Sequence, residues 1–173
     1  MITPKQQAPE LEIALLDGGT WKLSEQKPEN FTLLVFYRGL HCPVCKKYTE
    51  ELQDLKDEYL DLGVNILALS MDTEKRAKKS KEEWDIDDIS IGYGLTEAQA
   101  KAWGLYLSKG IKDAEPELFS EPGLFLVRPN NEVYYVALNS EPFGRPHLSS
   151  FKKSIEFVLE KNYPARGEVN YRE

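Results

Sequence analysis

The sequence predicts a single α/β domain whose mixed central sheet has helices on both faces. Three observations predict this class. In the first half of the chain, buried apolar runs alternate with a segment of helical spacing, which favours parallel strands joined by right-handed crossovers. A strand–turn–strand pattern precedes this alternation, and a second one follows it and adds antiparallel strands. The length of 173 residues suits one domain, with a core over about residues 8–161 and a polar tail over 162–173.

The first half of the chain predicts a hairpin, then two buried strands with a helix between them. Asp17-Gly18-Gly19 separates two short apolar segments, and its glycines suit the positive φ angles of a hairpin turn. The apolar run 31–37 is typical of a strand buried on both faces. Apolar residues then recur every three or four positions over 42–61, which predicts one amphipathic helix. The run 64–69 predicts the next core strand.

The second half predicts short helices, a second hairpin and a closing helix. The lysine-rich segment 73–84 is typical of a solvated helix. Thr96 and Gln99 form a capping-box pattern that opens another short helix, which ends near Trp103. The remaining elements are expected as a strand within 86–93, a hairpin over 124–127 and 133–138, and a helix over 148–159.

Composition and charge exclude two classes of partner. Hydrophobic residues make up 41% of the chain and charged residues 29%, an ordinary mix for a globular protein. The net charge of −7 argues against nucleic acid as a main partner, because phosphate binding needs a basic surface. No stretch is apolar enough for a secretion signal or long enough to cross a bilayer. We therefore expect a cytoplasmic protein without membrane contact.

Both cysteines of the chain lie in one short segment, Cys42-Pro43-Val44-Cys45, directly after a buried run. The start of a helix supplies unpaired N–H groups and the positive end of the macrodipole, which favour a thiolate over a thiol. Arg38 and His41 lie within a few residues and add positive charge. Positions i and i+3 are neighbours in a first helical turn, so the two sulfurs can bond with little backbone change. The pattern predicts a catalytic pair, with Cys42 at an exposed tip as attacker and Cys45 on the apolar face as resolving sulfur.

Three interpretations of this pair stay open. The first is an enzyme that reduces a peroxide or a disulfide and is re-reduced by an external thiol, since no flavin or nicotinamide signature appears. The second is a non-catalytic redox sensor or binding module. The third is a zinc-binding scaffold, which is disfavoured because a closed site needs four ligands and only His41 and His147 could add to the cysteines. We expect no cofactor and no metal, and we interpret the insertion at 106–120 as a docking loop or an active-site lid.

These motifs resemble the peroxiredoxin-like branch of the thioredoxin-fold redoxins, often called AhpC/TSA, over about residues 8–161. The segment 35–45 is similar to the FYRGxxCPxC pattern of a peroxiredoxin-like subgroup, and the opening hairpin resembles that of the family. The strand that follows Pro122 is similar to the one that thioredoxins enter through a cis-proline. The resemblance implies a thioredoxin-like three-layer α/β/α fold with a mixed central sheet and the N-terminal β-hairpin as an extension.

The resemblance also implies an activity, a thiol peroxidase or a thiol–disulfide oxidoreductase. It implies a thioredoxin- or glutathione-type reductant and a monomer or homodimer. The peroxidatic position of typical peroxiredoxins matches Cys45, whereas the thioredoxin nucleophile matches Cys42. Typical peroxiredoxins have Pro in place of Arg38, and their active-site Arg falls near the strand where this chain has Pro122. Arg128 and Arg145 are the arginines nearby in the sequence, and neither matches that place, so Arg38 is the candidate replacement.

Overall fold

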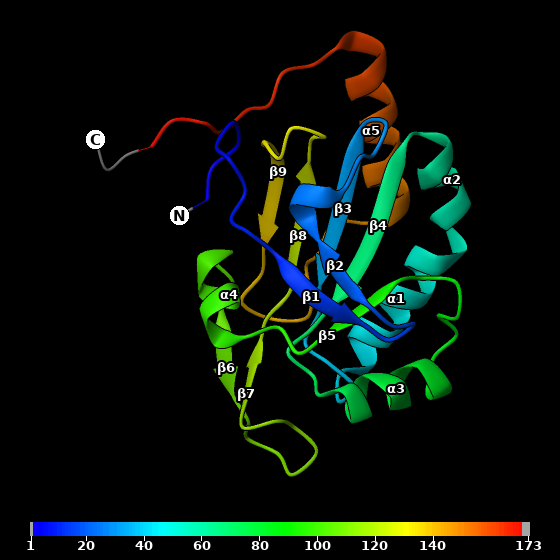
Figure 1. The fold of residues 1–173 in the computed structure, drawn as a ribbon, viewed down its shortest axis with the longest axis vertical. Coiled ribbons are helices and arrows are strands. Elements are labelled where there is room, and N and C mark those ends of the chain that lie inside the picture. The colour runs from blue at the N-terminus through cyan, green and yellow to red at the C-terminus, as the bar shows by residue number, and fades with distance from the viewer. Residues whose placement is uncertain (1, 171–173) are drawn as a thin grey trace.

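The computed structural model describes residues 2–170, and Figure 1 shows their arrangement. Within these residues one seven-stranded sheet has the order β2-β1-β5-β4-β3-β8-β9, and β6 pairs with β7 in a separate two-stranded sheet. The strands are β1 (Glu12–Leu15), β2 (Thr20–Lys22), β3 (Phe31–Phe36), β4 (Val64–Leu69), β5 (Ile91–Tyr93), β6 (Leu107–Lys109), β7 (Leu118–Ser120), β8 (Gly123–Val127) and β9 (Val133–Leu138). The helices are the 3-10 turn η1 (Leu23–Glu25), α1 (Pro43–Asp54), α2 (Lys56–Asp61), α3 (Glu74–Glu83), α4 (Glu97–Ala102) and α5 (Leu148–Lys161).

The centre of the sheet is parallel and its margins are antiparallel. β3 pairs in parallel with β4, from Phe31 opposite Val64 to Phe36 opposite Leu69, and β4 pairs in parallel with β5. β8 and β9 add antiparallel strands on one side, and the β1–β2 hairpin adds them on the other. This topology confirms the predicted mixed sheet with an N-terminal hairpin extension.

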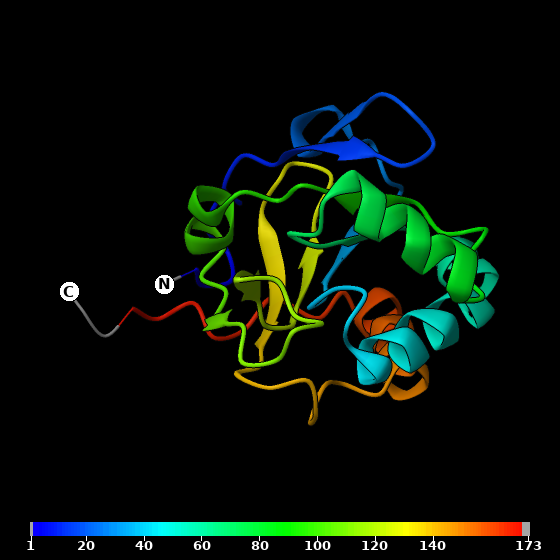
Figure 2. The same ribbon diagram turned by 90° about the horizontal axis from the view of Figure 1, so that it is seen from below.

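Helices cover both faces of the sheet, which explains the continuous apolar run in β3. Figure 2 shows α1, α2, α3 and α5 on one side of the sheet and α4 on the other. All six residues of β3 are buried. Leu33 belongs to the core cluster under α1 and α5, whereas Leu34 belongs to the cluster that contains Trp103 at the end of α4. A strand packed on both faces has no solvent side, so apolar–polar alternation disappears.

The helix predicted over 42–61 is interrupted, and this part of the prediction is wrong. Cys42 is the N-cap rather than the first helical residue, and Leu55 separates α1 from α2. Beyond the break, Tyr59 is fully buried and its Oη donates to Leu148 O at 2.7 Å. This bond is a tertiary contact with α5, which the helical spacing of apolar residues does not encode.

The insertion at 106–120 forms the β6–β7 hairpin, and its connecting loop projects beyond the sheet (Figure 1). The described part of the predicted tail, 162–170, packs against its own chain. Ala165 is buried, and Glu168 Oε1 lies 2.7 Å from Lys5 Nζ. The remainder of the predicted tail, 171–173, lies outside the described residues. Among residues 2–170 we find no helix long and apolar enough to cross a membrane.

Candidate active site

The two cysteines sit where β3 gives way to α1. Cys42 is the N-cap of α1, and Pro43 occupies the first turn, where its missing N–H costs no hydrogen bond. Cys42 and Cys45 form a disulfide, with their Cα atoms 5.2 Å apart. The Cys45 N–H donates to Cys42 Sγ at 3.1 Å. The structure therefore confirms that the cysteines lie at a strand–helix junction and that their sulfurs are close enough to bond.

Neither sulfur is at an exposed tip. Cys42 is 1% exposed and Cys45 is 0% exposed, and both belong to the core cluster that contains Tyr37 and Leu124. The prediction of an exposed Cys42 is wrong, because tertiary packing covers the start of α1. Pro43, the next residue, is exposed. The disulfide thus lies just beneath the surface.

The turn that leads into the disulfide is held by a buried carboxylate. Asp72 follows β4, accepts the Leu40 N–H at 2.8 Å and pairs with Arg76 Nε at 2.9 Å. Gly39 adopts φ +135°, and a Cβ built there would lie 2.7 Å from Asp72 Oδ1. Only glycine fits both this backbone conformation and this close approach. The buried charge of Asp72 is stabilised by two partners and fixes the backbone before Cys42.

Arg38 lies on the same turn and forms an ion pair that the sequence does not indicate. Its Nε lies 3.0 Å from Glu121 Oε2, and its guanidinium carbon lies 4.8 Å from the centroid of the Phe119 ring. Glu121 is buried, and its other oxygen accepts from Ser108 Oγ at 2.7 Å. The predicted positive charge of Arg38 is present, but it is paired with Glu121 rather than with either cysteine.

His41 is half-buried against the β6–β7 hairpin. Its ring centroid lies 4.6 Å from that of Phe119, in an edge-on arrangement. Within the described chain, both ring nitrogens are buried and have no hydrogen-bond partner. Burial, together with the positive charge of Arg38, lowers the pKa of His41 below its ordinary 6.5. His41 is therefore neutral at neutral pH and adds no positive charge to the site, contrary to the prediction.

Arg145, which was not expected in the site because its position does not match the family's active-site arginine, lies beside Cys45. It lies between β9 and α5, and its Nη2 is 3.6 Å from Cys45 Sγ. Its guanidinium carbon lies 4.2 Å from the centroid of the Tyr48 ring, and its Nε donates to Pro142 O at 3.0 Å. Burial lowers the pKa of Arg145 to about 10, so the group remains charged at neutral pH. It is separated from Cys45 by 100 positions, and no local spacing rule connects the two.

A groove opens beside Arg145. Its volume is about 290 Å³, and its lining includes Val44 and Tyr48 from α1 and the loop residues Pro142 and Phe143. Arg145 Nη1 is buried and has no hydrogen-bond partner within the described chain. The groove therefore lies beside the guanidinium that contacts Cys45 Sγ, although neither cysteine is among its lining residues.

Pro122 is buried between Glu121 and β8, and its carbonyl accepts from Asn139 N at 3.0 Å. All peptide bonds within residues 2–170 are trans, so the cis-proline suggested by the resemblance is absent. The trans form is the favoured state of most X–Pro bonds. No group of three or more His, Cys, Asp or Glu residues in this range stands in a metal-binding arrangement.

The chain is similar to known proteins both in sequence and in fold. The AhpC/TSA family model matches residues 4–136. A search of the curated proteins found no significant match. The fold is similar to that of a cysteine-to-serine mutant of the peroxiredoxin 6 of Arenicola marina, with a TM-score of 0.80, 16% identity, and coverage of 94% of this chain and 76% of that chain.

Two further solved structures cover almost the whole length of both chains. Peroxidoxin BcpB from Mycobacterium tuberculosis has a TM-score of 0.74 and 17% identity, over 91% of this chain and 99% of that one. A putative thiol:disulfide interchange protein DsbE from Chlorobium tepidum has a TM-score of 0.66 and 18% identity, over 93% and 98%. These likenesses confirm the predicted thioredoxin-like three-layer fold.

Proposed function

Because this chain belongs to the AhpC/TSA family, we propose that it is a thiol peroxidase in which Cys45 attacks a hydroperoxide and Cys42 resolves the product into the disulfide. Family membership confirms the predicted resemblance and the predicted enzyme class, a thiol peroxidase or thiol–disulfide oxidoreductase. The observation that carries the narrower proposal is the contact between Arg145 Nη2 and Cys45 Sγ.

Burial of the sulfurs supports a small oxidising substrate. A protein disulfide reacts through a mixed disulfide, so the layer over the cysteines would have to open in the oxidation step as well as in the later reduction. Cys42 and Cys45 are 1% and 0% exposed. Hydrogen peroxide or a small organic hydroperoxide needs much less space and can approach through the groove beside Arg145.

The surroundings of the two sulfurs support Cys45 as the attacker. The guanidinium of Arg145 stabilises a thiolate on Cys45, since opposite charges within about 4–6 Å favour the charged form. Its unpaired Nη1 can donate to a peroxide oxygen as negative charge develops there. Cys42 is stabilised instead by the N-terminus of α1, through the Cys45 N–H. This assignment replaces the one based on an exposed Cys42.

The chemical steps balance with the two cysteines alone. The Cys45 thiolate attacks the distal oxygen of ROOH, the O–O bond breaks, and RO⁻ leaves and takes a proton to become ROH. Cys45 is now a sulfenic acid. The Cys42 thiolate attacks its sulfur, the S–O bond breaks, and hydroxide leaves as water after protonation. The cysteine pair has then lost two electrons in total, and the disulfide remains until an external dithiol reduces it.

Turnover of the wild-type protein tests the proposal. Reduced protein would be mixed with excess hydrogen peroxide and dithiothreitol, and peroxide loss would be followed in time. We expect many turnovers per chain and loss of turnover in Cys45→Ser. One oxidation without cycling would identify a redox sensor instead. Catalysed reduction of a model protein disulfide, with peroxide consumed no faster than by a free thiol, would identify a disulfide oxidoreductase.

A further inference from the structure

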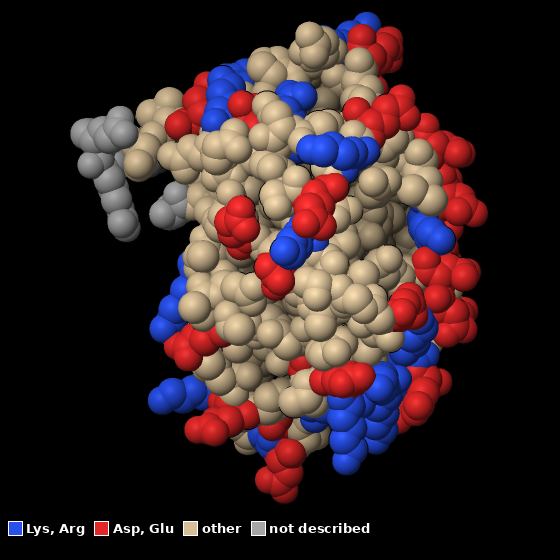
Figure 3. Space-filling view, in the orientation of Figure 1, with Lys and Arg blue, Asp and Glu red and all other residues tan. Residues whose placement is uncertain are grey.

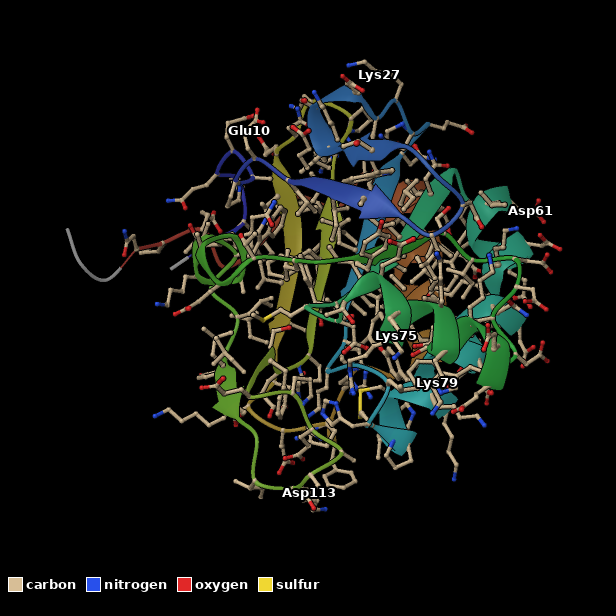
Figure 4. All side chains as sticks on the ribbon, turned by 60° about the horizontal axis from the view of Figure 1, so that its bottom comes forward. Glu10, Lys27, Asp61, Lys75, Lys79 and Asp113 are labelled. Carbon is tan, nitrogen blue, oxygen red and sulfur yellow. A yellow bond between two sulfur atoms is a disulfide. The ribbon has the colours of Figure 1, made fainter. Side chains whose placement is uncertain are left out.

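The buried disulfide must be reached by a reductant, and its surroundings at the surface carry two unexplained features. In the view of Figure 4 the disulfide lies between the loop that carries Asp113 and the helix that carries Lys75 and Lys79. We call the first feature the 110–117 loop and the second the lysine face of α3. Neither feature takes part in the peroxide chemistry described above.

The lysine face is a basic patch on an acidic chain. Helix α3 carries four lysines within ten residues, whereas the whole chain has a net charge of −7. Figure 3 shows basic side chains gathered over α3, at the lower right. Lys78 and Lys79 form ion pairs with glutamates of their own helix, and yet their side chains stay 58% and 59% exposed. These two side chains are thus accessible to a second molecule, whereas Lys81 is 25% exposed and its Nζ lies 2.7 Å from Asp17 Oδ1.

The 110–117 loop presents an apolar side chain on an ordered turn. Ile111 is 86% exposed, the most exposed large hydrophobic residue among those described. Its backbone N–H donates to Glu115 Oε2 at 2.7 Å, and the Lys112 N–H donates to the same oxygen at 3.2 Å. These hydrogen bonds order the loop while Ile111 stays exposed. An ordered apolar side chain of this kind is suited to a protein interface.

A hydrogen bond joins the two features. Arg76 of α3 donates through Nη2 to Ala114 O at 3.3 Å, and its Nε pairs with Asp72. Asp72 holds Leu40 in the turn before Cys42. The lysine face and the 110–117 loop therefore form one surface, connected to the backbone that carries the disulfide.

We propose that this surface docks the protein dithiol that reduces the Cys42–Cys45 disulfide, and that this partner is acidic around an apolar centre. The proposal rests on the function proposed above, which needs a reductant. The lysines would contact the acidic rim, and Ile111 would contact the apolar surface around the partner's thiols. Charge complementarity selects the partner, because the rest of this chain is acidic and repels an acidic protein elsewhere.

The exchange then has a defined direction. A partner thiolate attacks Cys42 Sγ, which lies beside the exposed Pro43, and Cys45 leaves as a thiolate stabilised by Arg145. The partner's second thiolate then attacks the partner sulfur that is bonded to Cys42 in the mixed disulfide, and Cys42 leaves. The partner is oxidised to a disulfide, and the two protons of its dithiol pass to the released cysteines. Opening of the surface layer over Cys42 must accompany the attack, since Cys42 is 1% exposed.

Reduction of the isolated disulfide form tests the docking surface without any peroxide step. The oxidised protein would be mixed with an acidic thioredoxin, and separately with dithiothreitol, and the rate of disulfide loss would be measured at low and high salt. The variants are the double substitution Lys75→Glu, Lys79→Glu and the single substitution Ile111→Ser. The matched control is Lys101→Glu with Lys161→Glu, which reverses two lysines that are 64% and 57% exposed on other helices.

We expect the α3 double variant to slow reduction by thioredoxin about 10-fold at low salt, because rim charges act mainly on association rates. High salt should remove most of this difference. Reduction by dithiothreitol and the rate of the control variant should stay within about twofold of wild type. Equal thioredoxin rates in the α3 variant and the control would overturn the proposal. So would an equal slowing with dithiothreitol, which would place the effect in the disulfide itself. Failure of the peroxidase proposal would appear separately, in the rate of peroxide loss.

Discussion

Replacement of Arg145 by methionine tests the contact on which the proposed mechanism depends. The substitution keeps a long side chain over Tyr48 but removes the positive charge, which lies 3.6 Å from Cys45 Sγ. At that distance, two unit charges interact by about 1 kcal/mol in water and by about 5 kcal/mol at an effective dielectric constant of 20. Arg145 is only half-buried, so we expect the loss to fall at about 1–2 kcal/mol.

This loss should appear as a slower reaction with peroxide. A penalty of about 1–2 kcal/mol on the Cys45 thiolate corresponds to a rate roughly 5- to 30-fold lower at neutral pH. In the assay the reduced protein is mixed with hydrogen peroxide in a stopped-flow instrument, and the reaction is monitored by tryptophan fluorescence. Arg128→Met is the matched control, because Arg128 stacks on Tyr134 and makes no contact with the cysteines. An Arg145→Met rate within twofold of wild type would refute the assigned role of Arg145.

Two further predictions concern the turn before the disulfide. Gly39→Ala should lower the free energy of unfolding by at least about 2 kcal/mol in urea denaturation, because the added Cβ would meet Asp72 at a backbone φ of +135°. Gly18→Ala is the control: its φ of +98° is also positive, but no atom lies within 4 Å of the new Cβ, so a similar loss there would reject the steric argument. The folded-state pKa of His41 lies below its ordinary 6.5, so the unfolded chain binds the extra proton and stability is lost as the pH falls below about 6.5. His41→Phe should reduce this loss between pH 7 and pH 5, and identical pH profiles of unfolding free energy would contradict a buried neutral imidazole.

The parts of the fold that could be predicted are those set by local patterns. The continuous apolar run of β3 predicts burial on both faces, and the structure buries all six residues between two layers. The Thr96–Gln99 capping box opens α4 as predicted, since both of its hydrogen bonds involve residues three positions apart. The Cys-Pro-Val-Cys segment predicts its own place at a strand–helix junction. Such features depend on residues that are close in the sequence, so they can be predicted without knowledge of the tertiary contacts.

The parts that could not be predicted depend on contacts between distant segments. Arg145 reaches Cys45 because the loop between β9 and α5 passes beside α1, a result of sheet order rather than of spacing. Arg38 is directed to Glu121 for the same reason, because β8 pairs with β3. The predicted exposure of Cys42 is wrong because a position at the start of a helix does not determine which other segments pack over it.

The most direct test of the central claim locates the first oxidised sulfur. Reduced Cys42→Ser, which keeps an N-cap residue, would be mixed with one equivalent of hydrogen peroxide, and the sulfenic acid would be trapped with dimedone and assigned by peptide mass spectrometry. The mechanism predicts label on Cys45 at a rate close to that of wild type, while Cys45→Ser reacts no faster than a free thiol. Rapid label on Cys42 in Cys45→Ser, with a slow Cys42→Ser, would contradict the mechanism and reverse the roles of the two sulfurs.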